Sequence, residues 1–204
     1  MIEKIHWLGH DTFKIEGEVV IYTDPYQIKR KDAANIILIT HEHYDHCSPE
    51  DVQKLLTKDT TVVAPADCAS KLGGKVRTVK LGDSFSLGEV KIEVVPAYNV
   101  NKTFHPKKNG WVGYVITIQG TRIYLAGDTD RIPEMKNLGK IDIALLPVSG
   151  MYVMTAREAA EAALHDIKPT IAVPMHYGSI VGSGKDAEEF RRLLEGKIQV
   201  VIKG

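Results

Sequence analysis

Short apolar runs separated by turn-forming residues dominate the first half of the chain. Three such runs, Lys4–Leu8, Thr12–Ile15 and Val19–Tyr22, contain the β-branched and aromatic residues that favour strands. Gly17-Glu18 lies between the last two runs and indicates a hairpin turn. The opening of the chain is therefore expected to be rich in β-structure.

A continuous apolar run, Asn35–Ile39, has the composition of a strand that is buried on both faces. Similar runs recur through the rest of the chain and predict further strands. These are Thr61–Ala64, Lys75–Val79, Val90–Val95, Trp111–Ile118, Arg122–Ala126, Ile141–Leu146, Thr170–Pro174 and Ile198–Ile202.

Helices are predicted at three places. The first begins at Ser48, with Pro49 at its first position and Asp51 placed to close a capping box. The second covers 155–167 and also opens with a capping-box pattern, and the third covers 186–194. Strands interspersed with amphipathic helices predict an α/β fold of layered sheets, formed as a single domain over 1–204.

Composition and charge narrow the class of protein. Hydrophobic residues make up 44% and charged residues 25% of the 204 positions, which is ordinary for a globular protein. Lys+Arg and Asp+Glu both number 26, so no net charge draws the chain to nucleic acid or to a membrane. Two cysteines make no disulfide framework, and no apolar run approaches the ~18 residues of a membrane helix. A cytoplasmic protein with a small-molecule substrate is expected, and a homo-oligomer is left open.

The densest chemical signal follows the Asn35–Ile39 run directly. Four side chains that bind metals, His41, His43, Asp45 and His46, lie within six residues. Imidazole nitrogens and carboxylate oxygens are ligands that zinc and similar divalent cations prefer. One ion would use two or three of these groups, so their density suggests a pair of ions.

Further polar residues follow other predicted strands. Asp128 follows Arg122–Ala126, His176 follows Thr170–Pro174, and Asn99 with His105 comes after Val90–Val95. Binding sites in α/β proteins collect at the carboxyl ends of strands, where loops supply the chemistry. These residues are therefore expected to complete the metal site.

The order of these motifs resembles the metallo-β-lactamase superfamily. The resemblance rests on the HxHxDH pattern of 41–46, the Gly-Asp-Thr of 127–129 and the late His176. The segments 6–10, 146–154 and 173–177 are similar to one branch of metal-dependent hydrolases within it. That branch is similar in pattern to ascorbate-phosphate lactonase and N-acyl-phosphatidylethanolamine phospholipase D. The resemblance implies a four-layer αββα sandwich over nearly the whole chain.

The same resemblance implies how the ligands divide between two ions. His41 and His43 would bind the first ion together with either His105 or Asn99, of which His105 has the expected spacing. Asp45, His46 and His176 would bind the second ion, and Asp128 would bridge both ions. Zinc is the expected metal, with manganese, iron and nickel as alternatives.

Two adjacent ions can hold a bridging hydroxide that attacks a carbonyl carbon or a phosphorus atom. The sequence therefore predicts a metal-dependent hydrolase that cleaves an ester, lactone, amide or phosphodiester bond in a small, and conceivably anionic, substrate. Asp45 would also orient the nucleophile. Three further residues are candidates for catalytic or supporting roles at the same rim, namely His10, Lys102 and Tyr177.

Two other functions compete with this hypothesis. A nuclease is a rival enzyme, but the neutral charge balance and the lack of room for a nucleic-acid clamp count against it. A non-catalytic metal-binding module that kept the fold is the other alternative, and the nearly complete ligand set argues against it. A diiron redox protein is disfavoured, because such sites use a carboxylate where His43 stands.

Overall fold

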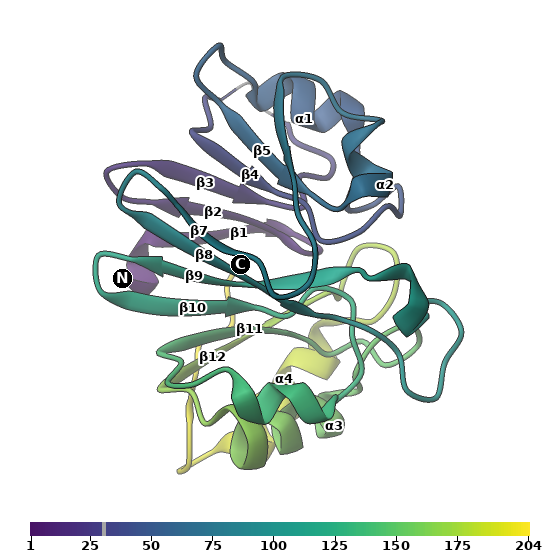
Figure 1. Ribbon diagram of the computed structural model, residues 1–204. Helices are drawn as coiled ribbons and strands as arrows, with labels where there is room; N and C mark the ends of the chain where they lie inside the picture. Colours follow the sequence, from purple (N-terminus) through teal and green to yellow (C-terminus); the bar gives the residue numbers. More distant parts are fainter. Residues whose placement is uncertain (30–31) are drawn as a thin grey trace. The chain divides into compact units, whose positions relative to one another are not determined.

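The computed structural model describes residues 1–29 and 32–204 and divides into two compact units (Figure 1). The first unit comprises Met1–Lys80 and the second comprises Leu81–Gly204. Each unit contains one mixed β-sheet with helices of its own. The α/β class is as the sequence predicts, while one domain over 1–204 stays a prediction.

The sheet of the first unit has six strands in the order β1-β2-β3-β4-β5-β6. Strands β1 to β3 are antiparallel, and β3 to β6 are parallel. The parallel strands therefore bring the segments that follow β3, β4 and β5 to one edge of the sheet. The strands span β1 Ile5–Gly9, β2 Thr12–Glu16, β3 Val20–Thr23, β4 Ile36–Leu38, β5 Thr61–Ala64 and β6 Lys75–Thr78.

Two helices, α1 (Pro49–Leu55) and α2 (Ala66–Ala69), lie beside β4 and β5 (Figure 1). In β4, Ile37 belongs to the core shared with these helices, while Ile36 and Leu38 are buried on the opposite face. The predicted strand that is buried on both faces is thus confirmed. The helix-facing core is apolar and includes Ile37, Ile39, Cys47, Val52, Leu55, Val62, Ala64 and Cys68.

The predicted start of α1 is correct, but its capping box is wrong. Ser48 Oγ accepts from the Asp51 backbone N–H at 3.2 Å, as an N-cap should. The Asp51 carboxylate instead accepts from the backbone N–H groups of Gln27 and Ile28, both at 2.9 Å. Burial alone would raise the pKa of Asp51, but the hydrogen bonds from Lys54, Ser48 and these backbone groups lower it. Asp51 therefore fastens a distant loop to the helix.

The sheet of the second unit has seven strands in the order β13-β12-β11-β10-β9-β8-β7. Strands β7 to β10 are antiparallel, and β10 to β13 are parallel. Strand β7 was not predicted, and the predicted 198–202 strand is shorter than expected. The strands span β7 Ser84–Leu87, β8 Val90–Pro96, β9 Val112–Ile118, β10 Thr121–Leu125, β11 Ile143–Pro147, β12 Ile171–Met175 and β13 Gln199–Val200.

Helix α3 (Ala156–Glu161) continues as a π-helical segment, Ala162–Ile167, and α4 covers Gly184–Leu194. The predicted capping box of Thr155 and Glu158 is confirmed at the start of α3. Both helices pack beside the parallel strands of this sheet (Figure 1). The sequence therefore predicted the extent of the 155–167 helix, although not its change of pitch.

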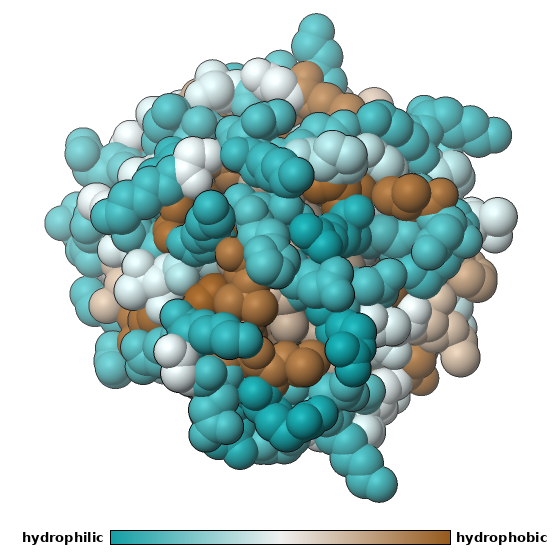
Figure 2. Space-filling view, turned by 90° about the horizontal axis from the view of Figure 1, so that it is seen from below, coloured by the Kyte–Doolittle hydropathy of each residue, from teal (hydrophilic) through white to brown (hydrophobic). Residues whose placement is uncertain are grey.

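Large apolar side chains are exposed at several places on the surface. The face in Figure 2 is mostly hydrophilic, with smaller hydrophobic areas. No helix among residues 1–29 and 32–204 is both long and apolar enough to cross a membrane. The exposed large hydrophobic residues are Leu8, Tyr44, Leu81, Val100, Phe104, Met151 and Ile180.

Candidate metal centre

The histidine-rich loop of the first unit is anchored by a carboxylate from the neighbouring strand. Asp24 follows β3, its backbone N–H donates to Leu38 O at 2.9 Å, and its side chain is fully buried. Its carboxylate accepts from Thr40 N at 2.8 Å, Thr40 Oγ1 at 2.6 Å and His46 Nδ1 at 2.9 Å. Strand pairing thus places Asp24 where it fixes the start and the end of the loop.

These bonds determine which nitrogen carries the proton when the imidazoles of His41 and His46 are neutral. An ionised carboxylate can only accept, so His46 Nδ1 must donate to Asp24 and its Nε2 holds the lone pair. Thr40 gives its single hydroxyl proton to Asp24, so it accepts from His41 Nδ1 at 2.9 Å. His41 therefore also presents Nε2 as a potential metal ligand.

The ring positions fit a metal ion. His41 Nε2 lies 3.1 Å from His43 Nδ1. Two nitrogens bound to one tetrahedral zinc at about 2.0–2.1 Å lie about 3.3 Å apart, so the pair is close to ligand spacing. The rings of His41 and His46 are 4.0 Å apart between centroids. The first unit therefore gathers nitrogen donors as a metal site requires.

His10 supports the last part of the same loop. Its Nε2 lies 2.9 Å from Asp45 Oδ2, and that oxygen is 3.6 Å from His46 Nε2. His10 and Asp24 adopt φ values of 50° and 35°, a region that non-glycine residues seldom occupy. Such strain persists where the surroundings impose it, and it often accompanies functional sites. His10 thus contacts a predicted ligand, as expected of a supporting residue.

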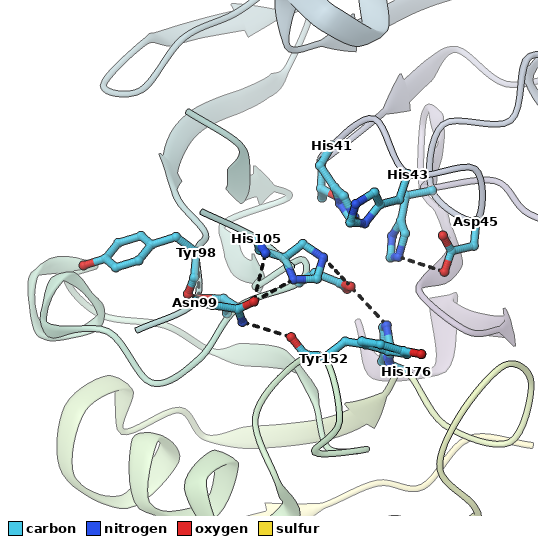
Figure 3. Close-up of polar contacts among 12 residues, drawn as sticks. His41, His43, Asp45, Tyr98, Asn99, His105, Tyr152 and His176 are labelled. Atoms are coloured by element: carbon cyan, nitrogen blue, oxygen red, sulfur yellow. Dashed lines mark hydrogen bonds and ion pairs between the residues drawn. The ribbon is translucent and has the colours of Figure 1, made fainter. Parts of the chain in front are cut away.

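In the second unit, one carboxylate oxygen faces two histidines. Asp128 follows β10, and its Oδ2 lies 3.1 Å from Nε2 of both His105 and His176 (Figure 3). His176 follows β12, has a φ of 60°, and places Nδ1 2.8 Å from Ser149 Oγ. Parallel pairing of β10, β11 and β12 brings Asp128, Ser149 and His176 to one edge of the sheet.

Asn99 orients His105. The Asn99 Oδ1 accepts from the backbone N–H of His105 at 2.9 Å and lies 3.1 Å from its Nδ1 (Figure 3). An amide oxygen cannot donate, so Nδ1 carries the proton and Nε2 holds the lone pair. A lone-pair nitrogen and a carboxylate oxygen at 3.1 Å repel unless a proton or a metal cation lies between them. His105, rather than Asn99, therefore faces Asp128.

Asn99 is itself held by a buried acid that sequence reasoning missed. Its Nδ2 donates to Asp130 Oδ1 at 3.1 Å and to Tyr152 O at 2.9 Å. Asp130 also accepts from Lys102 Nζ at 2.5 Å. Lys102, expected as a catalytic or substrate-attracting residue, is thus engaged in an ion pair. An acid two positions after the predicted ligand Asp128 was the signal that could have revealed Asp130.

Tyr177 follows the ligand candidate His176 and is buried. Burial raises the pKa of its phenol, so the group stays protonated at neutral pH. Its catalytic role stays a prediction, as do the roles of the other predicted site residues. Each unit nevertheless gathers imidazoles and carboxylates, which are the kinds of ligand that a divalent metal ion prefers.

Comparisons with known proteins agree with these features. A family model described as a beta-lactamase superfamily domain matches residues 4–176. A UPF0173 metal-dependent hydrolase of Thermococcus kodakarensis is 34% identical over 215 residues, covering 98% of this chain and 95% of that protein. A relative of the same description from Pyrococcus furiosus is 35% identical over 217 residues, with the same coverage.

Solved structures show the same fold. A protein of Parabacteroides distasonis, described as a metal-dependent hydrolase, matches with a TM-score of 0.85 and 38% identity, covering 98% of this chain and 91% of that one. A metallo hydrolase of Ignicoccus hospitalis matches with a TM-score of 0.78 and 25% identity, covering 97% and 93%. The predicted superfamily and fold are confirmed. The chain belongs to the β-lactamase superfamily and is a metal-dependent hydrolase of the branch that contains these relatives.

Proposed function

We propose that this hydrolase binds two divalent ions, with zinc preferred, and cleaves an ester, lactone, amide or phosphodiester bond in a small molecule. The proposal retains the ligands that the sequence predicts, all of which lie within the matched residues 4–176. The proposed ligands are His41, His43, Asp45, His46, His105, Asp128 and His176. Seven donors exceed what one tetrahedral ion uses, which supports a pair.

The observation that carries the proposal is the fixed orientation of the histidines. His41, His46 and His105 each have Nδ1 held by an oxygen, so Nε2 is the nitrogen with the lone pair. Such acceptors on the second ring nitrogen are typical of metal-binding histidines and increase their basicity. A purely structural cluster would not require the same nitrogen to be presented at all three positions.

Bound divalent ions supply Lewis-acid chemistry, since they polarise a substrate oxygen and acidify water. The protein's own groups then orient the reactants. Asp45, held by His10 at 2.9 Å, accepts a hydrogen bond from the attacking water and directs it. Tyr177, which burial keeps protonated, is the candidate that donates a proton to the leaving group.

Elemental analysis combined with a substrate panel tests the proposal. The purified protein should hold about two ions per chain and hydrolyse at least one class among esters, lactones, amides and phosphodiesters. Asp45→Asn and Asp128→Asn should each reduce turnover by at least about a hundredfold. Asp59→Asn, at an exposed position of the first unit, is the matched control and should change neither measurement.

Two results would contradict the proposal. Full turnover in both ligand variants would exclude the two-ion mechanism. Cleavage of RNA or DNA with a steep dependence on salt, and of nothing in the small-molecule panel, would favour the nuclease instead.

A further inference from the structure

Two loops of the second unit expose apolar side chains next to candidate metal ligands. Val100, Phe104 and Met151 are 63%, 46% and 59% exposed, and Tyr152 is partly exposed. We call these four residues the apolar platform. Isolated apolar side chains are ordinary on protein surfaces, but a group of them beside a reaction centre points to a ligand.

The two loops are fastened to each other. The rings of Phe104 and Tyr152 meet edge to face, with centroids 4.7 Å apart and an interplanar angle of 85°. In addition, Asn99 Nδ2 donates to Tyr152 O at 2.9 Å (Figure 3). These contacts hold Phe104 and Tyr152 of the platform in place relative to each other.

The platform is continuous with the histidines of this unit. Phe104 directly precedes His105, which Asn99 orients. In the other loop, the backbone N–H of Met151 donates to Ser149 O at 3.1 Å, and Ser149 Oγ lies 2.8 Å from His176 Nδ1. A group resting on the platform would thus lie beside these histidines.

Charge in these loops disfavours an anionic ligand. Two of the three lysines between Val100 and Gly110 are paired with acids. Lys102 Nζ lies 2.5 Å from Asp130 Oδ1, and Lys107 Nζ lies 2.9 Å from Glu134 Oε1. These cations are already neutralised, whereas the apolar side chains remain exposed to solvent.

We propose that the apolar platform binds a neutral aromatic group of the substrate, so that esters bearing an aromatic ring are preferred over small alkyl esters and phosphorylated substrates. The preference for esters rests on the proposed function, whereas the binding of an aromatic group does not. An aromatic ring can make edge-to-face contact with Phe104 or Tyr152 and a sulfur contact with Met151.

Binding can be measured without turnover. With ¹³C-methyl methionine, the Met151 methyl signal, assigned through Met151→Leu, should shift on titration with the neutral probe N-benzylacetamide and much less with N-methylacetamide. Phe104→Ala should weaken the binding of N-benzylacetamide about tenfold. Leu81→Ala removes a similarly exposed side chain outside the two loops and should leave it unchanged.

Kinetics supply the second arm. We expect kcat/KM for benzyl acetate to exceed that for methyl acetate, whose leaving alcohol is of similar acidity, by at least about tenfold, and Phe104→Ala to abolish most of this difference with unchanged metal content. Binding at Met151 without hydrolysis of any ester, lactone, amide or phosphodiester would contradict the proposed function and not the platform. Hydrolysis without aromatic preference, no shift of the Met151 signal, or a shift that follows protein concentration alone would overturn the platform. The last result would mean that a second copy of the chain covers it.

Discussion

Asp24→Asn is the sharpest test of the argument that buried acceptors orient the metal-binding histidines. The substitution keeps the size and shape of the side chain but replaces one oxygen by an NH₂ group. Three donors point at the native carboxylate, from Thr40 N, Thr40 Oγ1 and His46 Nδ1. Whichever way the amide is turned, its NH₂ group meets at least one of these donors.

The magnitude follows from the bonds that are lost. Hydrogen bonds to a charged group contribute about 1.5–3 kcal/mol each, and a buried donor without an acceptor costs about 1–3 kcal/mol. Loss of an acceptor behind a ligand histidine typically weakens metal binding by about 10–100-fold. We therefore expect a 10–100-fold weaker zinc affinity for Asp24→Asn, and a metal-free protein that is about 1–3 kcal/mol less stable.

Three measurements separate orientation from stability. Competition with a chelating dye gives the zinc affinity, and urea unfolding of the metal-free protein gives the free energy of unfolding. Long-range ¹H–¹⁵N spectra of His46 report which nitrogen is protonated. A variant with lower stability but native zinc affinity and a native His46 tautomer would refute the reasoning, because Asp24 would then be structural only.

Three further predictions concern other residues. Asn99→Asp retains an acceptor for His105 but places a second carboxylate where Asn99 Nδ2 donates to Asp130 at 3.1 Å. Because the two carboxylates repel each other, the zinc affinity should fall about tenfold. The double variant Asn99→Asp with Asp130→Asn should recover part of this affinity. The folded protein lowers the pKa of Asp51, so the ionised carboxylate stabilises the fold. This contribution is fully present above the ordinary pKa of an aspartate, near 4, and is lost as the pH falls through the lower pKa of the folded protein. Between pH 5 and pH 3, the free energy of unfolding in urea should therefore fall less for Asp51→Asn than for the native protein. An equal fall in both proteins would contradict this. Gly113→Ala would place a Cβ 2.7 Å from Leu125 O in β10, so unfolding by heat should show a stability lower by about 1–3 kcal/mol, and a native melting temperature would be inconsistent with this clash.

Most of the fold could be predicted because its signals are local. Apolar runs marked the central strands, and Thr61–Ala64 was predicted with its observed ends. The missed strand β7 (Ser84–Leu87) has a half-exposed pattern at the edge of its sheet, so its sequence carries little apolar signal. The capping box of α1 failed because Asp51 contacts a loop 23 and 24 positions away, which no local pattern encodes.

The cluster of candidate ligands could be recognised from the sequence, because the spacing of His41 to His46 is local. Their orienting partners were less accessible to sequence reasoning. Asp24 lies 16 positions from Thr40, and Asn99 lies 31 positions from Asp130. Strand pairing and loop folding create these contacts. The contact between Asn99 and His105 was likewise not predicted, since only the hydrogen-bond pattern shows that Asn99 is turned toward His105.

The two units orient a histidine by the same chemical arrangement. In the first, Thr40 donates to buried Asp24 and accepts from His41. In the second, Asn99 donates to buried Asp130 and accepts from His105. Each intermediate residue must donate on one side and accept on the other, which a hydroxyl or an amide can do and a carboxylate cannot. This requirement explains why Thr and Asn occupy these positions. It also assigns Asp24 and Asp130 to holding histidines in place, whereas Asp45 and Asp128 remain the acids proposed to bind metal.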